Sequence, residues 1–390
     1  MKARWNPEFA AAPLALALPL ALLATGCASG GPSEGQASHA AARSGGPPCP
    51  LFGGENVDDL IAPGETHFAH LWMLTTDGEN AEAYWNSTGD RLVFQRRNPD
   101  LGVECDRIYV TGPAQAPVQV STGRGTTTCA YFLPNDRSVI YASTHGLADA
   151  CPPPIDPSEF RTLGYFWRVF PEFDLWVQDL AGGEPRRLTE TYGYDAEATV
   201  SPRGDRIVFT SSRSGDLDLW TCDLEGGDLR QVTDTPGYDG GAFFSHDGKR
   251  LVFRSQAFTP GKESQELAET RELMAQWRVR PSRMELQISD ADGSNRRTLG
   301  PLGGASFAPY FFLDDRRVIF ASNHHDPGEM KREFDLFAIG VDGQGLERIT
   351  TRPGFDSFPM FSPDGRYLVF ASNRGQRKPG ETNLFLAEWR

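Results

Sequence analysis

Basic residues and long apolar runs are both scarce in this chain, and each shortage excludes a class of protein. The 390 residues include 38 Lys and Arg against 52 Asp and Glu, which gives a formal net charge of −14. A nucleic-acid-binding protein needs basic side chains that release counterions from phosphate, so no nucleic-acid partner is expected. Apart from one run near the N-terminus, no stretch approaches the roughly 20 apolar residues that span a bilayer. The 25 Phe, 10 Tyr and 8 Trp argue against disorder over the whole length.

Motifs of the common enzyme classes are also missing. Residues 66–390 contain no Gly-x-Ser-x-Gly elbow, phosphate-binding loop, His-Glu-x-x-His pair or dinucleotide fingerprint. The last repeat described below runs to the end of the chain, so we expect no hydrolase domain after it. The sequence therefore favours a binding function over catalysis, and it indicates no cofactor.

The one apolar run, from Phe9 to Ala24, has the features of an export signal. It follows Lys2 and Arg4 and ends in Leu-Ala-Thr-Gly-Cys27. The small residues before Cys27 resemble a bacterial lipobox, in which this cysteine is acylated and becomes the mature N-terminus. An ordinary secretory signal with an incidental cysteine is the alternative. We therefore expect a signal peptide at 1–26 and an exported protein on the cell envelope.

Residues 27–65 are expected to form a flexible, lipid-anchored tether. Of the 23 residues in 28–50, 18 are Gly, Ala, Ser or Pro, a composition that builds no core. The lipid would be the protein's only contact with a membrane. In a cell with two membranes, we expect the anchor on the periplasmic face of the outer membrane.

The rest of the chain repeats one pattern six times. The run Ser362-Pro-Asp-Gly-Arg-Tyr-Leu-Val-Phe370, a turn and an apolar strand, has relatives that end at Phe94, Tyr141, Phe209, Phe253 and Phe320. Units of roughly 44–50 residues, two of them enlarged, are the size of a four-stranded propeller blade. The sequence predicts an all-β, six-bladed β-propeller over 66–390. Its blades are expected near 79–125, 126–193, 194–237, 238–304, 305–354 and 355–390 plus 66–76.

The sixth unit lacks a fourth strand, and the segment Leu71–Thr75 resembles the missing one. We expect this N-terminal strand to complete the last blade and close the ring. The six in-phase repeats resemble the TolB-like six-bladed β-propeller family over about residues 66–390. Only the expected tether stands where the full-length members carry an α/β domain, which implies a stand-alone propeller. The resemblance also implies that the propeller binds an envelope protein or lipoprotein.

When the six repeats are aligned on the aromatic residue that ends each apolar strand, the strand-end aromatic, the alignment predicts where polar side chains gather. Residues 14 and 12 places before it enter the innermost strand, and residues four places after it leave the next strand, so all lie at one mouth of the central channel. A period of two predicts that the first two sets share one strand face. The expected partner-binding mouth comprises Asp195, Glu197, Asp239, Asp356, Glu82, Asn80, His145, Arg213, His324, His325 and Arg374. Long insertions at 145–171 and 256–283 are expected to decorate it.

Two other interpretations stay open for this mouth. Any single aspartate at a strand entry can instead cap a turn. The mouth could also belong to a carbohydrate-active or metal-dependent enzyme similar to oligogalacturonate lyases, with a small molecule or oligosaccharide as ligand. The candidates for that chemistry are His145, His324, Arg213 and Arg374. The carboxylates of the mouth argue against an acidic substrate.

His324, His325 and Asp326 are the candidate metal ligands, because imidazole and carboxylate groups commonly bind metal ions. Consecutive residues on an extended segment point in opposite directions, however, which favours a hydrogen-bonded or partner-contacting role. The sequence therefore assigns no metal.

The cysteines leave several pairings open. With Cys27 acylated, five of the 6 cysteines remain, so at least one stays free. Cys105, Cys129 and Cys151 map to the decorated mouth, and an oxidising envelope permits a disulfide there. We expect Cys129–Cys151, with Cys105–Cys129 as the second choice and three reduced thiols as the alternative.

Overall fold

The computed structural model describes residues 46–113, 115–328 and 331–390. The expected signal peptide 1–26, the lipidation site Cys27 and the first part of the expected tether lie outside these residues. Within them, no helix combines the length and apolarity needed to cross a membrane.

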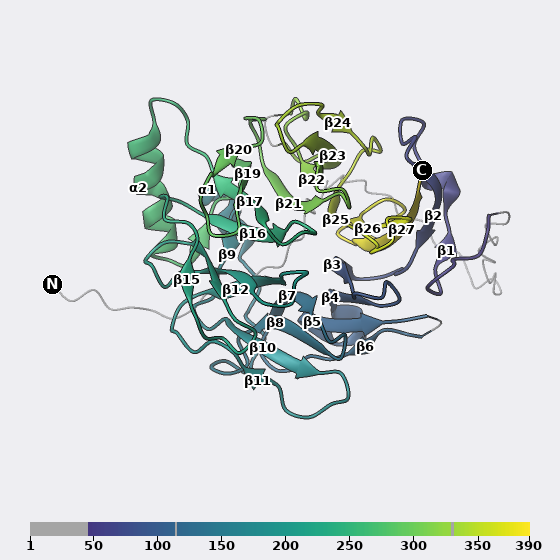
Figure 1. Ribbon diagram of the computed structural model, residues 1–390, viewed down its shortest axis with the longest axis horizontal. Helices are drawn as coiled ribbons and strands as arrows, with labels where there is room; N and C mark the ends of the chain where they lie inside the picture. Colours follow the sequence, from purple (N-terminus) through teal and green to yellow (C-terminus); the bar gives the residue numbers. More distant parts are fainter. Residues whose placement is uncertain (1–45, 114, 329–330) are drawn as a thin grey trace, which may run out of the picture.

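Six antiparallel sheets surround a common centre, each with its first strand innermost (Figure 1). Blade 1 consists of β3 (Glu79–Trp85), β4 (Leu92–Asn98), β5 (Val103–Thr111) and β6 (Val118–Gln119), with the 3-10 helix η2 (Pro99–Leu101) between β4 and β5. Blade 2 consists of β7 (Thr127–Phe132), β8 (Ser138–Ser143), β10 (Asp174–Asp179) and β11 (Arg186–Arg187). Blade 3 consists of β12 (Asp195–Val200), β13 (Ile207–Ser211), β14 (Asp218–Cys222) and β15 (Arg230–Gln231).

The second half of the chain continues the same order. Blade 4 consists of β16 (Asp239–Phe244), β17 (Arg250–Gln256), β19 (Met284–Asp290) and β20 (Arg297–Thr298). Blade 5 consists of β21 (Ser306–Phe311), β22 (Arg317–Ser322), β23 (Asp335–Gly340) and β24 (Glu347–Arg348). Blade 6 consists of β25 (Asp356–Phe361), β26 (Tyr367–Ser372), β27 (Asn383–Trp389) and, from the start of the domain, β2 (Phe68–Met73). The predicted six-bladed β-propeller is confirmed.

The repeated sequence pattern has a simple physical basis. The aromatic residue that defines each repeat lies in the second strand, and all six rings are at most 1% exposed. The turn before that strand is held by its first residue, as where Ser362 Oγ accepts a hydrogen bond from the Tyr367 N–H at 3.0 Å. Gly365 ends this turn with φ at 71°, a conformation that glycine adopts without steric cost.

The ring closes as expected, through a strand from the N-terminal side. Strand β2 pairs antiparallel with β27, with Leu71 opposite Ala387, and β1 (Glu55–Asn56) pairs with the outer edge of β2. Phe52, Val57 and Leu60 around the 3-10 helix η1 (Asp58–Leu60) are at most 5% exposed. Residues 52–65 therefore belong to the folded domain, and the expected tether ends earlier than residue 65. Unlike 28–50, this segment carries apolar side chains that blade 6 can bury.

Every innermost strand carries a bulge at the same position. Its residue has φ between 49° and 59° in all six blades: Glu82, Cys129, Glu197, Gly241, Ala308 and Phe358. The pairing register shifts there, as between Ala196 and Thr199. Ser211 Oγ donates to Asp195, whereas Thr210 Oγ1 donates to Glu197, and consecutive side chains of β13 point to opposite faces. The prediction that the two polar sets share a face is therefore wrong, because the bulge interrupts the period of two.

The two long insertions join into a cap over the mouth. It contains α1 (Pro157–Leu163) and β9 (Trp167–Arg168) from blade 2, and α2 (Glu263–Met274) and β18 (Arg278–Val279) from blade 4. Strands β9 and β18 pair with Arg168 opposite Arg278, and Glu159 forms ion pairs with both arginines. Since the two parent blades flank blade 3, the cap bridges it.

A disulfide fastens the start of the blade 2 insertion to blade 1. It joins Cys105 of β5 to Cys151, with Cα atoms 5.8 Å apart. Cys129 is a free thiol, so the predicted Cys129–Cys151 disulfide is wrong, and so is the second choice, Cys105–Cys129. The bulge explains the error, because it brings the Cys129 thiol beside the carboxylates of Glu82 and Glu197.

Candidate functional site

Aromatic side chains fill the middle of the central channel. Tyr84 of blade 1 and Phe243 of blade 4 have ring centroids 5.4 Å apart, although their blades stand opposite each other. Tyr131 and Tyr310 also pack against Phe243. All four lie ten places before the strand-end aromatic of their repeat, so the repeat alignment predicts that these aromatic side chains come together. The mouth is therefore a recess closed from below by these side chains.

A buried ion pair lies between the cap and the four aromatic side chains that fill the channel. Glu197 pairs with Arg254 and accepts a hydrogen bond from Tyr238 Oη at 2.6 Å. Burial raises the pKa of Glu197, but Arg254 and the hydrogen bonds outweigh it and hold the pKa below its usual value. Trp167 of the cap lies over the Arg254 guanidinium, with Cζ 5.4 Å from the ring, and contacts Phe307 of blade 5 edge-on. We call blades 2–5 the covered side of the mouth.

The strand-entry aspartates are already paired within the chain. The pairs are Asp195 with Arg213 at 2.7 Å, Asp239 with Arg296 at 2.9 Å and Asp356 with Arg374 at 2.7 Å. Arg374 also contacts Glu65 at 3.0 Å, and this pair is almost completely buried. These charges are neutralised by the protein itself, which agrees with the interpretation of each aspartate as a structural cap.

His145 and His324 occupy the place that arginine takes in blades 3 and 6. Their Nδ1 atoms lie 2.8 and 3.0 Å from the hydroxyls of Ser143 and Ser322, as Arg213 Nε lies 2.7 Å from that of Ser211. Burial and, to a smaller extent, the nearby charge of Arg124 lower the pKa of His145 to about 4, so this ring is neutral near pH 7. Both histidines act as caps of their strand ends.

A second set of aspartates, at the entries of the third strands, was not predicted as a set. Asp174, Asp218 and Asp335 each accept a hydrogen bond from the threonine 15 residues later, at 3.2–3.4 Å. Burial raises the pKa of the first two to about 6 and that of Asp335 to about 7. The recurrence of Asp and Thr at this spacing is a sequence signal for a structural hydrogen bond in blades 2, 3 and 5.

The predicted metal candidates do not converge. The Asp326 carboxylate accepts hydrogen bonds from the backbone N–H groups of Gly328 and Glu333, and His324 faces Ser322. His325 instead lies 2.7 Å from Asp335 and 3.6 Å from Glu333, which forms a three-residue cluster of potential ligands. Arg348 contacts both carboxylates of that cluster, so a cation of the protein already occupies it.

Blades 6 and 1 form the open side of the mouth. Figure 1 places the cap elements α1, α2 and β9 away from β3 and β25. Between these blades lies a pocket of about 60 Å³, lined among others by Glu79, Asp106, Gln95, Phe355, Phe358 and Glu381. Burial raises the pKa of Glu79 to about 7, despite its ion pair with Arg97 at 2.6 Å, and that of Asp106 to about 6.

Two predicted residues lie next to this pocket. Burial also raises the pKa of Glu82 to about 7, and Asp106 and Glu197 contribute in the same direction. Asn80 is fully buried and donates from Nδ2 to the carbonyls of Asp77 and Thr382. Glu79 and Asp106 themselves were missed, because neither occupies a position that the repeat marks as polar.

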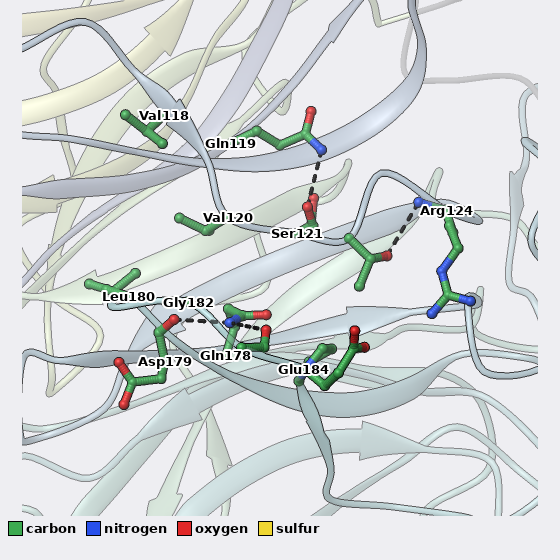
Figure 2. A pocket seen from close by; sticks show the side chains of 13 residues that line it. Val118, Gln119, Val120, Ser121, Arg124, Gln178, Asp179, Leu180, Gly182 and Glu184 are labelled. Carbon is green, nitrogen blue, oxygen red and sulfur yellow. Dashed lines mark hydrogen bonds between the residues drawn. The ribbon is translucent and has the colours of Figure 1, made fainter.

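A larger hollow, of about 540 Å³, lies at the perimeter between blades 1 and 2 (Figure 2). It separates β6 from the β10–β11 turn, where a Cβ on Gly182 would meet nothing within 4 Å. At the junctions between blades 2 and 3 and between blades 3 and 4, the turn between the third and fourth strands packs against the preceding blade. A Cβ on Gly226 or Gly293 would lie 2.6 or 2.1 Å from a backbone oxygen there. The hollow is therefore a gap in blade packing, and no predicted site residue lines it.

Comparisons with known proteins agree with the fold. No family model matches the chain. Over 107 residues it is 30% identical to the Tol-Pal system protein TolB of Francisella tularensis subsp. mediasiatica, and these make up 26% of this chain. The matched segment spans only 22% of the relative's length.

Solved structures with the same fold include two proteins described as TolB. Putative TolB from Agrobacterium tumefaciens aligns with a TM-score of 0.51 at 16% identity, over 80% of this chain and 91% of that one. TolB from Acinetobacter baumannii aligns with 0.52 at 17% identity, over 77% and 63%. An oligogalacturonate lyase in complex with manganese aligns with 0.50 at 13% identity, over 86% and 96%. These identities establish the fold alone. With the sequence similarity and the six-bladed ring, the described residues form a TolB-like β-propeller.

Proposed function

We propose that this chain is an exported, lipid-anchored propeller that binds a protein of the bacterial cell envelope through the open side of its mouth. The observation that carries the proposal is the cap, which covers blades 2–5 and leaves blades 6 and 1 accessible. Similarity to a Tol-Pal system protein supports a protein-binding role at the envelope in general. Export and lipid attachment at Cys27 rest on the sequence of the first 27 residues.

A carbohydrate-active function has weaker support. The lyase shares the fold at 13% identity, which carries no information on activity. Carboxylates line the open pocket and would repel an acidic sugar. His145 and Arg213, two of the candidate catalytic residues, are engaged with the serines at their strand ends.

Photo-crosslinking tests the binding role. The side chain of Gln376, exposed at the rim of the open pocket, is replaced by p-benzoylphenylalanine in cells that export the full chain. The matched control carries the same probe at Val118, which is 61% exposed at the perimeter hollow. We expect one discrete crosslinked envelope protein from position 376 and none from position 118. Equal labelling from both positions would contradict a binding site at the mouth.

The lipid anchor is tested separately. In a bacterium that exports the protein, wild type is expected in the membrane fraction and to incorporate labelled palmitate. Cys27→Ala is expected to be released in soluble form without label, because the substitution removes the thiol that the expected lipobox would acylate. A Cys27→Ala protein that still fractionates with membranes and carries label would rule out this anchor.

A further inference from the structure

The open pocket is short of positive charge. Asp106 lies within electrostatic reach of both Glu79 and Glu82, and Arg97 is the arginine that pairs with Glu79. The Asp106 carboxylate makes no ion pair with any described residue, although Arg97 and Arg107 lie within electrostatic reach of it. On the covered side, by contrast, each mouth carboxylate has its own arginine.

An unused donor points to a ligand in the same pocket. Gln95 lines it and is only 8% exposed. Its Oε1 accepts hydrogen bonds from the Thr128 hydroxyl at 3.1 Å and the Cys129 N–H at 3.2 Å. Because a backbone N–H can only donate, these contacts fix the orientation of the amide and leave Nε2 on the pocket side. Within the described residues, Nε2 donates to no acceptor.

The size and walls of the pocket restrict the occupant. A volume of about 60 Å³ admits the end of one side chain and excludes a strand or helix. Phe355 and Phe358 supply apolar walls against which an aliphatic stem or a guanidinium can pack. Carboxylates at the end of such a site complement an ammonium or guanidinium group. A lysine or arginine residue also brings a main-chain carbonyl, the acceptor that Gln95 lacks.

We propose that the partner of this propeller inserts a lysine or arginine side chain into the pocket between blades 6 and 1, where Asp106 and Glu79 bind its charge. This inference rests on the proposed function and names the partner group that its open side recognises.

The charge preference is tested with small probes on the full chain. Nα-acetyl-argininamide and Nα-acetyl-lysinamide are titrated by saturation-transfer NMR at low salt, with Nα-acetyl-citrullinamide as the neutral isostere. We expect the cationic probes to bind and the citrulline probe to bind about tenfold more weakly, the change that loss of one charge interaction produces. Equal affinity of the arginine and citrulline probes would overturn the inference.

Matched variants locate the effect. Asp106→Asn is isosteric and is expected to weaken the arginine probe about tenfold. It removes a carboxylate without an ion-pair partner, so its melting temperature should not fall at neutral pH. Glu184→Gln, at the perimeter hollow, should leave the affinity unchanged. Unchanged probe binding in Asp106→Asn would overturn the inference. So would stoichiometric Ca²⁺ binding that displaces the probe, because the site would then be a metal site.

A crosslinking arm separates this inference from the proposed function. Asp106→Asn should lower the yield of the adduct formed from position 376 together with the probe affinity. An unchanged adduct yield would overturn the inference and leave the proposed function standing. The absence of any adduct in the wild type would overturn the proposed function, while the probe titration would still measure the charge preference of the pocket.

Discussion

The covered and open sides of the mouth are built from the same sequence repeat, but their carboxylates differ in their ion-pair partners. On the covered side, Glu197 lies on Arg254 beneath Trp167, and Asp195 and Asp239 hold their own arginines. On the open side, Asp106 has no ion-pair partner among the residues that the structure describes, and Glu79 keeps a raised pKa in spite of Arg97. A strand-entry carboxylate is therefore not by itself a sign of a binding site. The covered side differs from the open pocket by its cap and by the ion-pair partner that Asp106 lacks among the described residues. Pairing alone does not separate the two sides, because Asp356 of blade 6 keeps its own arginine.

The largest expected effect concerns the ion pair of the covered side. Arg254→Met keeps the length of the side chain but leaves Glu197 buried and unpaired, which should cost about 3–5 kcal/mol of the free energy of unfolding. Urea denaturation measures the loss. Asp106→Asn on the open side is the matched control and should cost nothing. Similar losses in the two variants would abolish the contrast between the sides.

The disulfide that anchors the cap insertion should have the next largest effect. Cys105→Ser with Cys151→Ser removes a link between residues 46 apart in sequence. We expect a loss of about 2–4 kcal/mol in the free energy of unfolding, since the open chain gains conformational freedom in the unfolded state. Cys129→Ser, which changes a free thiol, should cost less than half as much. The reverse order would mean that Cys129 forms the stabilising link.

The pH dependence of stability should reveal the carboxylates of the open pocket. Burial raises the folded-state pKa of Glu79 to about 7 and of Asp106 to about 6, above their unfolded values. Both groups therefore bind more protons in the folded state, so their contribution is complete below about pH 4 and is lost as pH rises through those values. Arg97 and Arg107 oppose the shift of Asp106, and Arg97 opposes that of Glu79.

Glu79→Gln with Asp106→Asn should flatten this profile. We expect the difference in unfolding free energy between about pH 5 and pH 8 to shrink by an amount on the order of 2 kcal/mol. Chemical denaturation at both pH values measures it, and Glu184→Gln serves as the exposed control. A profile that stays as steep in the double variant would mean that other groups carry the dependence.

The smallest expected effect separates the cap from the pocket. Trp167→Ala removes the ring above Arg254 but touches no residue that lines the open pocket. It should cost about 1–3 kcal/mol of stability, as expected for a partly buried aromatic. The affinity for the arginine probe should remain within about twofold of wild type. A large loss of affinity would show that the two sides act as one site.

Most of the fold was predictable because the repeat is strong. A turn followed by an apolar strand recurs six times, and each recurrence places a buried aromatic in the same strand. Ring closure by Leu71 and its neighbours followed from the missing strand of blade 6. The predicted site fared less well. His145, His324 and Arg213 were predicted to line a binding mouth, whereas in the structure the serines at their strand ends engage them.

Three features decided the site and escaped the sequence. The bulge at Glu82, Cys129 and Glu197 reverses side-chain direction, although no residue type marks it: the six bulge positions hold five different residue types, glycine and alanine among them. The pairing of β9 with β18 joins insertions about 110 residues apart, and two-residue strands carry too little pattern to be recognised. The Cys105–Cys151 disulfide follows from where the insertion folds back.

The sequence by itself determined the six-bladed ring, its closing strand and the end of the channel where polar residues gather, because those depend on periodic local patterns. Only the tertiary structure decided which of these residues are neutralised and which remain available to a ligand. Ion pairs, a bulge and a cap depend on contacts between distant segments, such as Glu197 with Arg254 and Trp167 with Phe307. Those contacts leave Asp106 and Glu79 among the carboxylates that line the open pocket.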